Sequence, residues 1–290
     1  VIVNCPSTGR YEVLGYSDFL SQDYNTDTGE FELEGLAYEK QLTQSVLRVS
    51  SDHMTTIGIL QGHGELDEDG LSALITLLKN NRYNVQTVNL LSGDTLEEVD
   101  LLIFAAPQKD LSDGETEQIK AFAQEGGSLF VMRDYTDPID SMPNYMALLK
   151  SYGVVPLPGV VVAGAQDTDT YYEEQIQLLP YMESLDITLP LTTTGMDVLL
   201  MPAACAFENP GEATESLSVG TVLKTGPNAY VRDVSDGSAS IDRQPGDVQG
   251  ELTVALYAHK MHANGNVSRL FAAGNSALFT YEYMYQRTYA

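Results

Sequence analysis

The stretch 57–70, IGILQGHGELDEDG, places a histidine and a carboxylate where a predicted strand is followed by a predicted helix. His63 lies between two glycines, and Glu65 follows two residues later. A histidine and a glutamate at this separation can act as acid and base or bind a metal ion. Open α/β sheets bind ligands at the carboxyl ends of their strands. His63 and Glu65 are therefore candidate residues for contact with a ligand or a partner.

A structural role for His63 is nevertheless favoured over ligand contact and over catalysis. Gly62 and Gly64 permit a sharp turn because glycine adopts backbone conformations that other residues avoid. The imidazole can bond a neighbouring backbone group, and the acidic residues that follow suit the N-terminus of a helix. All three roles stay open at this point, and the turn is the preferred interpretation.

The other histidines and the two cysteines match no known site pattern. Cys5 and Cys205 are far apart and have no metal or redox spacing, so one disulfide and two buried thiols both remain open. His259 and His262 are three residues apart, but they follow a predicted strand and are interpreted as surface residues. The acidic strings ELDED and DTDTYYEE do not follow a calcium-loop pattern. We predict no metal site and no cofactor.

Composition excludes some classes of partner. The chain has 41 acidic and 15 basic residues and a formal charge of -26. Nucleic acid is excluded as a partner because phosphate binding requires clustered Lys and Arg, and an anionic membrane surface would repel the chain. The excess charge is typical of a solvated surface. No apolar run approaches the ~18–20 residues that span a bilayer.

Hydrophobic patterns predict an α/β fold. Apolar strand-like segments alternate with helical patterns, and a capping box at Ser112–Glu115 begins one of the helices. This alternation is typical of a three-layer sandwich with a mostly parallel, doubly wound sheet. The predicted strands of this part are 56–61, 84–90, 100–106 and 128–132. Later strands are predicted at 198–201, 219–224, 252–258 and 269–273, with few helices between them.

Three regions follow from this reading. Residues 1–35 precede the core and hold one predicted strand among polar loops. Residues 36–165 form the α/β core, and the strand-rich part 166–290 completes the same domain. The chain begins without Met, so we expect it to be an excised or processed piece.

The order of several segments resembles a known family. These are QLTQSVLRVSSD, IGILQGHGE, VDLLIFAAPQKDLSDGETEQIKAFAQEGGSLFVMRD and SRLFAAGNSALFT. Their order and spacing resemble the GldG-type, gliding-motility-associated auxiliary components of ABC transporters over roughly residues 36–285. Asn275 stands where an acidic residue is often seen in that family. The resemblance implies a sheet similar to those of flavodoxin and class I glutamine amidotransferases. It also implies that residues 1–35 are the tail of an upstream unit and a linker.

The turn Met132–Tyr135 bears on catalysis. An amidotransferase-like sheet would carry a nucleophilic Cys or Ser there, and this turn holds none suited to acyl transfer. Asp134 follows the predicted strand 128–132. Because parallel strands end at the same edge of a sheet, we expect Asp134 to approach His63 and Glu65. We predict no catalytic residue and no enzyme, with Asp134 as a third candidate contact.

The predicted function is a non-enzymatic, extracytoplasmic auxiliary or interaction domain of an ABC-type transport system. The resemblance implies a periplasmic or cell-surface location, anchoring by hydrophobic helices beyond one or both ends, and a membrane permease or other transporter subunit as partner. One alternative is a carbohydrate- or peptide-binding module with an unidentified small-molecule ligand. The other is a hydrolase or amidotransferase relative with a site at the strand ends.

Overall fold

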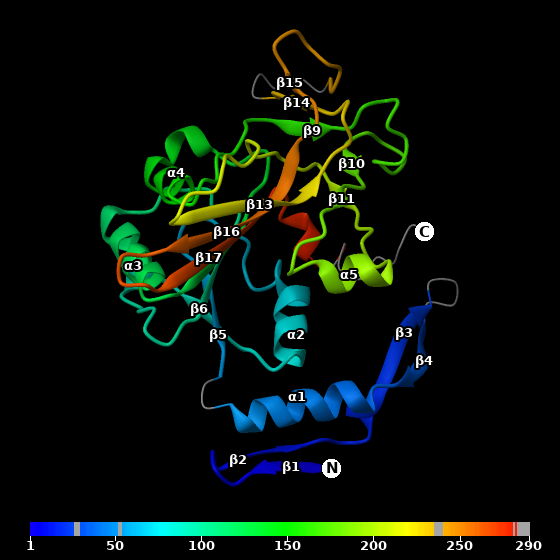
Figure 1. The fold of residues 1–290 in the computed structure, drawn as a ribbon, viewed down its shortest axis with the longest axis vertical. Coiled ribbons are helices and arrows are strands. Elements are labelled where there is room, and N and C mark those ends of the chain that lie inside the picture. Colours follow the sequence, from blue (N-terminus) through cyan, green and yellow to red (C-terminus); the bar gives the residue numbers. More distant parts are fainter. Residues whose placement is uncertain (26–29, 52–53, 235–239, 281, 283–290) are drawn as a thin grey trace. The chain divides into compact units, whose positions relative to one another are not determined.

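The computed structural model describes residues 1–25, 30–51, 54–234, 240–280 and 282 (Figure 1). The chain divides into two compact units. The first comprises Val1–Thr55 with Asn80–Asn84, and the second comprises Thr56–Lys79 with Val85–Ala290.

The first unit contains two antiparallel hairpins and one helix. The hairpins pair β1 (Ile2–Cys5) with β2 (Arg10–Val13) and β3 (Leu20–Asn25) with β4 (Glu30–Leu36). The helix α1 (Tyr38–Ser50) contacts β1 and β2.

Two contacts explain why α1 belongs to this unit. The Thr8 hydroxyl donates to the Val49 carbonyl, and Arg48 pairs with Glu12 at 3.3 Å. The sequence placed this helix in an α/β core beginning at residue 36, whereas the structure sets the boundary after Thr55. Amphipathic periodicity shows that a helix has an apolar face, but it does not show which strands cover that face.

The second unit is organised around a sheet that has eight strands among the described residues. Its spatial order is β11 (Tyr181–Met182), β13 (Leu217–Lys224), β16 (Thr253–Met261), β17 (Val267–Ala273), β8 (Ser128–Met132), β7 (Leu101–Ala105), β5 (Thr56–Leu60) and β6 (Asn84–Val88). The strands β17, β8, β7 and β5 run parallel. The strands β11, β13 and β16 extend the sheet in antiparallel pairings.

Helices cover both faces of the parallel strands. On one face, α2 (Ser72–Asn80) follows β5 and packs with Ile57, Ile59 and Ile103. On the other, α3 (Asp113–Gln124) and α4 (Pro143–Lys150) pack with Phe104 and Leu129. Because β7 contributes apolar side chains to both cores, it reads as a continuous apolar run. The predicted α/β class with a parallel core is confirmed, while the amidotransferase-like layering stays a prediction.

The smaller elements lie mostly after residue 155. The strands β9 (Val160–Val162), β14 (Tyr230–Arg232) and β15 (Val248–Gln249) form one sheet, and β10 (Gln177–Leu178) pairs with β12 (Met201–Pro202). Of the strand predicted at 198–201, only Met201 lies in a strand, because β12 begins there. Another helix is α5 (Leu189–Thr194). Single 3-10 turns among the described residues are η1 (Ser17–Phe19), η2 (Leu90–Ser92), η3 (Ile139–Ser141) and η4 (Ala277–Phe279).

The order of the parallel strands identifies where a ligand site is expected. Spatially β6, β5, β7, β8 and β17 follow one another, which is the order 2-1-3-4-5 of flavodoxin-like sheets. The chain leaves β5 and β7 toward opposite faces, with α2 on one side and α3 on the other. The carboxyl ends of β5 and β7 therefore form the topological switch point of the sheet. His63 follows β5 at this point.

Candidate functional site

The turn after β5 depends on two glycines. Gly62 has φ +124° and Gly64 has φ +80°, a backbone region that L-residues rarely adopt. At Gly64 an added Cβ would also lie 3.2 Å from the Cβ of Gln108. The Gln108 backbone N–H donates to the His63 carbonyl at 2.8 Å. The loops after β5 and β7 are thus in direct contact, which leaves the His63 ring inside the edge of the sheet.

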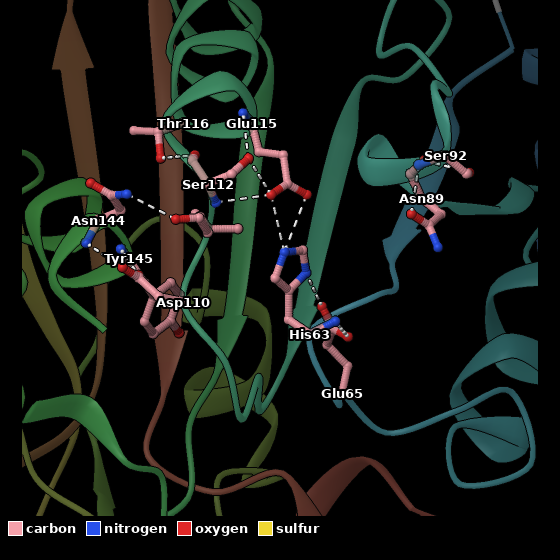
Figure 2. Close-up of polar contacts among 11 residues, drawn as sticks. His63, Glu65, Asn89, Ser92, Asp110, Ser112, Glu115, Thr116, Asn144 and Tyr145 are labelled. Atoms are coloured by element: carbon pink, nitrogen blue, oxygen red, sulfur yellow. Dashed lines mark hydrogen bonds and ion pairs between the residues drawn. The ribbon is translucent and has the colours of Figure 1, made fainter. Parts of the chain in front are cut away.

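His63 lies between two carboxylates, as Figure 2 shows. Its Nδ1 is 3.1 Å from Oε1 of Glu65, and its Nε2 is 3.2 Å from both carboxylate oxygens of Glu115. The second oxygen of Glu65 accepts the backbone N–H of His63 at 2.7 Å. None of the three side chains is more than 3% exposed. This group is called the His63 cluster.

Glu115 reaches the cluster from the first turn of α3. Its Oε2 accepts the Ser112 backbone N–H at 2.9 Å and the Ser112 hydroxyl at 2.7 Å. The Glu115 N–H in turn approaches the Ser112 hydroxyl oxygen, which completes the predicted capping box. The sequence identified Glu115 only as a cap. The signal that could have found its second role is topological, because α3 is the first helix after β7, the strand that neighbours β5.

The contacts within the His63 cluster shift the pKa values of His63 and Glu115 toward their charged forms. The hydrogen bond to Glu65 raises the pKa of His63 above its usual value, against the opposing effect of burial. Burial alone would raise the pKa of Glu115, but hydrogen bonds from Ser112 and the positive charge of His63 outweigh it and lower that pKa. Both ring nitrogens face acceptors, which suits an imidazolium with two N–H donors.

This arrangement limits what His63 can do chemically. A general base needs a free nitrogen within reach of the proton it removes, and both nitrogens of His63 are bonded to carboxylates. Burial of the ring also keeps substrate away. Within the described ranges, no group of three or more His, Cys, Asp or Glu is arranged to hold a metal ion. The geometry is that of a buried ion cluster that holds the switch-point loops in place.

Asp134 lies elsewhere on the same edge. Its carboxylate accepts the backbone N–H of Ser276 at 2.7 Å and the Ser276 hydroxyl at 2.6 Å. It therefore joins the end of β8 to the turn after β17. Of the three predicted contact residues, the structure brings His63 and Glu65 together, and Glu115 occupies the place expected for Asp134.

Asp137 and Gln108 connect the two groups. The side-chain amide of Gln108 donates to Oδ1 of Asp137 at 2.8 Å, and the backbone N–H of Asp134 donates to Oδ2 at 2.9 Å. Burial raises the pKa of Asp137 to about 6. Sequence reasoning missed both residues, since neither stands in a pattern with a known chemical meaning.

A cavity of about 450 Å³ lies beyond the end of β8. Its lining includes Arg133, Tyr135, Asp137, Asp140 and Pro158, but not His63. Arg133 is 1% exposed, and its Nη1 donates to the Leu157 carbonyl at 3.2 Å. The sequence offered one signal for it, a charged residue directly after an apolar strand.

Both cysteines are free thiols. Cys205 is fully buried, and its Sγ donates to the Arg133 carbonyl at 3.4 Å. Burial raises the pKa of this thiol to about 12, so it stays protonated at neutral pH. Cys5 lies in the first unit and is half-buried, so of the two thiols only Cys205 is part of a core.

Replacing Ser112 with alanine should lower the free energy of unfolding by about 1–2 kcal/mol, since the change removes an N-cap. The same hydroxyl also donates to Glu115, which places the effect toward the upper end. Urea denaturation of the wild type and the variant measures the difference. Ser141→Ala is a suitable control, because that exposed hydroxyl bonds only locally to the Pro138 carbonyl. Equal losses in both variants would contradict the special role of Ser112.

The fold and the buried cluster define an α/β domain whose switch point is filled by an ion cluster. Residues 54–272, well over half of the chain, match the family described as ABC-type uncharacterized transport system. The chain belongs to this family. The predicted auxiliary ABC transport component is thereby confirmed, and with it a transport-associated role in association with transporter components. No curated protein matched the chain.

The similarity to one solved structure supports the fold, and it bears on nothing else. The structure titled "mmIFT52 N-terminal domain" has a TM-score of 0.57 and 17% identity, covering 79% of this chain and 90% of that chain. A putative thua-like protein from Bacteroides uniformis has a TM-score of 0.41 and 12% identity, covering 78% and 83%. In the part of the chain that the structure describes, no helix is long and apolar enough to cross a membrane.

Proposed function

We propose that this chain is a non-enzymatic, extracytoplasmic interaction domain of an ABC-type transport system. The observation that carries the non-enzymatic part is the His63 cluster. The one histidine at the switch point has both nitrogens bonded to buried carboxylates, so it does not serve as an acid or base for a substrate. The family match supports the transport role. The GldG-type relationship, a link to gliding motility and a membrane anchor belong to the proposal through the resemblance of the segment order.

An exposed apolar surface supports the interaction role. Around α5, five large apolar side chains are 41–68% exposed within a segment of twelve residues, namely Ile187, Leu189, Leu191, Met196 and Val198. Contiguous exposed apolar groups mark interaction surfaces on soluble proteins. We call this group the α5 patch. A permease or another transporter subunit is the partner that the family membership favours.

Co-purification tests this proposal. A tagged chain expressed in its native host, cross-linked and purified, is expected to recover the permease or ATPase of a transport system. Leu191→Asp combined with Met196→Asp should reduce that recovery at least about tenfold, because a charge buried in an apolar interface is costly. Thr193→Asp is the matched control, since Thr193 is an exposed residue of the same helix.

Two results would overturn the proposal. One is recovery of the folded chain without any transporter subunit under conditions that preserve the transporter. The other is hydrolysis of an ester or of glutamine that is lost in His63→Ala. The location is tested separately in spheroplasts, whose periplasmic face is open to added protease. Protection of the chain there, equal to that of a cytoplasmic reference enzyme, would contradict the extracytoplasmic location.

A carbohydrate- or peptide-binding module is the second candidate function. The cavity beyond β8 favours it, because its volume lies within the ~300–1,000 Å³ of small-molecule sites.

A further inference from the structure

The cavity beyond β8 is lined by a buried cation that has no direct ion-pair partner among the described residues, although the charge of Arg133 acts on Asp137 from a longer distance. Arg133 is 1% exposed, and among the described residues no carboxylate lies within ion-pair distance of it. One carbonyl accepts from Nη1, and Nε has no hydrogen-bond partner in the described part of the chain. Burying a charge without a counter-ion or full hydrogen bonding is costly. The guanidinium is therefore suited to a ligand that supplies an acceptor.

The position of the cavity also suits a ligand. It opens at the carboxyl end of β8, the edge where open α/β sheets bind small molecules. A guanidinium presents several N–H donors in a plane and pairs with a carboxylate through two hydrogen bonds. A ligand carboxylate would therefore satisfy Nε and neutralise the buried charge.

The other charges of the cavity select among carboxylate ligands. Asp137 is buried and both of its oxygens already accept hydrogen bonds, from Gln108 and from the Asp134 backbone. Asp140 and Asp233 also line the cavity, and both are exposed. A simple anion would meet these carboxylates and a chain of net charge -26, whereas a simple cation would meet Arg133. A molecule that carries both charges can pair with Arg133 through its anionic group and with an exposed aspartate of the lining through its cationic group.

We propose that this cavity binds a free α-amino acid or a zwitterion of similar size, with its carboxylate on Arg133 and its ammonium group toward Asp140. The aromatic ring of Tyr135 and the ring of Pro158 line the same space and offer apolar contact to the ligand's side chain. This site does not depend on the transport role, and it uses none of the side chains of the His63 cluster.

Calorimetry with defined probes tests the site. The full chain is titrated with each of the common free amino acids, then with the N-acetyl and methyl-ester derivatives of the tightest binder. At least one amino acid is expected to bind with a Kd below about 1 mM. Each derivative lacks one charge and should bind at least about tenfold more weakly. A dipeptide, which separates the two charges, distinguishes a free amino acid from a peptide end.

Two variants place the site. Asp140→Asn should weaken amino-acid binding about three- to tenfold without weakening the N-acetyl derivative, whose ammonium charge is absent. Asp186→Asn, another exposed aspartate, should leave binding unchanged. Arg133→Met should abolish binding, with circular dichroism confirming the fold. If Arg133→Met does not fold, Asp140→Asn and the series of derivatives still test whether the cavity binds an amino acid through both of its charges.

Several outcomes would overturn the proposal. These are the absence of binding by any amino acid at 10 mM of ligand (about the weakest useful affinity for such a site), equal binding of the blocked derivatives, or unchanged binding in Asp140→Asn. Tighter binding of acetate or of a neutral monosaccharide would assign the cavity to another class of ligand. None of these results bears on recovery of transporter subunits, so this site and the proposed function fail separately.

Discussion

Replacing His63 with alanine is expected to lower the free energy of unfolding by about 3–5 kcal/mol while leaving the domain folded under native conditions. The change leaves Glu65 and Glu115 buried without the cation between them. Removing one partner of a buried ion pair costs more than the pair itself contributes, because the remaining charge stays desolvated. Urea denaturation measures the loss.

The pKa shifts of His63 and Glu115 determine the pH range in which the loss of stability is largest. A raised folded-state pKa means that His63 contributes fully below its ordinary value of 6.5, and that the contribution is lost as pH rises through the folded value. The lowered pKa of Glu115 means that its contribution is present above its ordinary value of 4.5 and is lost at lower pH. The effect of His63→Ala should therefore be largest between pH 4.5 and 6.5.

Two further variants control this experiment. His259→Ala removes an exposed histidine and should cost less than about 1 kcal/mol. Adding Glu115→Gln to His63→Ala should recover part of the loss, since it removes one of the unpaired charges. A His63→Ala variant as stable as His259→Ala would show that the cluster does not stabilise the switch point.

The second large effect concerns Asp137, whose stability contribution changes with pH. Burial raises its pKa from 3.8 to about 6, opposed by hydrogen bonds from Asp134 and Gln108 and by the charge of Arg133. The folded state therefore holds the proton more tightly than the unfolded state. The resulting stability is present in full below pH 3.8, is lost as pH rises to about 6, and stays lost above it. The difference between the two pKa values corresponds to about 3 kcal/mol.

Asp137→Asn should remove this part of the pH dependence. The difference in unfolding free energy between wild type and variant should shift by about 3 kcal/mol, in favour of the variant, between pH 4 and pH 7. Thermal or urea unfolding across that range measures it. Asp140→Asn, at an exposed position nearby, should show a shift of less than about 0.5 kcal/mol. A constant difference between wild type and Asp137→Asn would contradict the role of burial at this carboxyl.

Local signals in the sequence predicted the elements well. The capping box of α3 forms as expected, because Ser112 and Glu115 are only three residues apart and their bonds are internal to the first turn. The strand predicted at 100–106 forms as β7, which lies between β5 and β8 in the parallel sheet. A capping box and an apolar strand depend on residues that are close in the sequence, so local sequence patterns predict them.

Long-range pairings were less accessible. Glu115 meets His63 only because β5 and β7 are adjacent in the sheet, and Asp134 meets Ser276 only because β17 pairs with β8. The hydrophobic pattern of one segment does not predict which strands are its neighbours in the sheet. The sequence therefore identified the edge of the sheet that holds the candidate site, but it did not identify which carboxylates share a contact there.

The bonds among the loops at this edge have a consequence for the evolution of the domain. His63 is joined to Gln108, Gln108 to Asp137, and Asp134 to Ser276, so the turns after β5, β7, β8 and β17 brace one another. A lengthened turn at any of the four would displace its neighbour. Insertions that create new contacts are therefore expected in relatives at the opposite edge and in the C-terminal loops. A change of chain length there leaves the hydrogen bonds among the four turns intact.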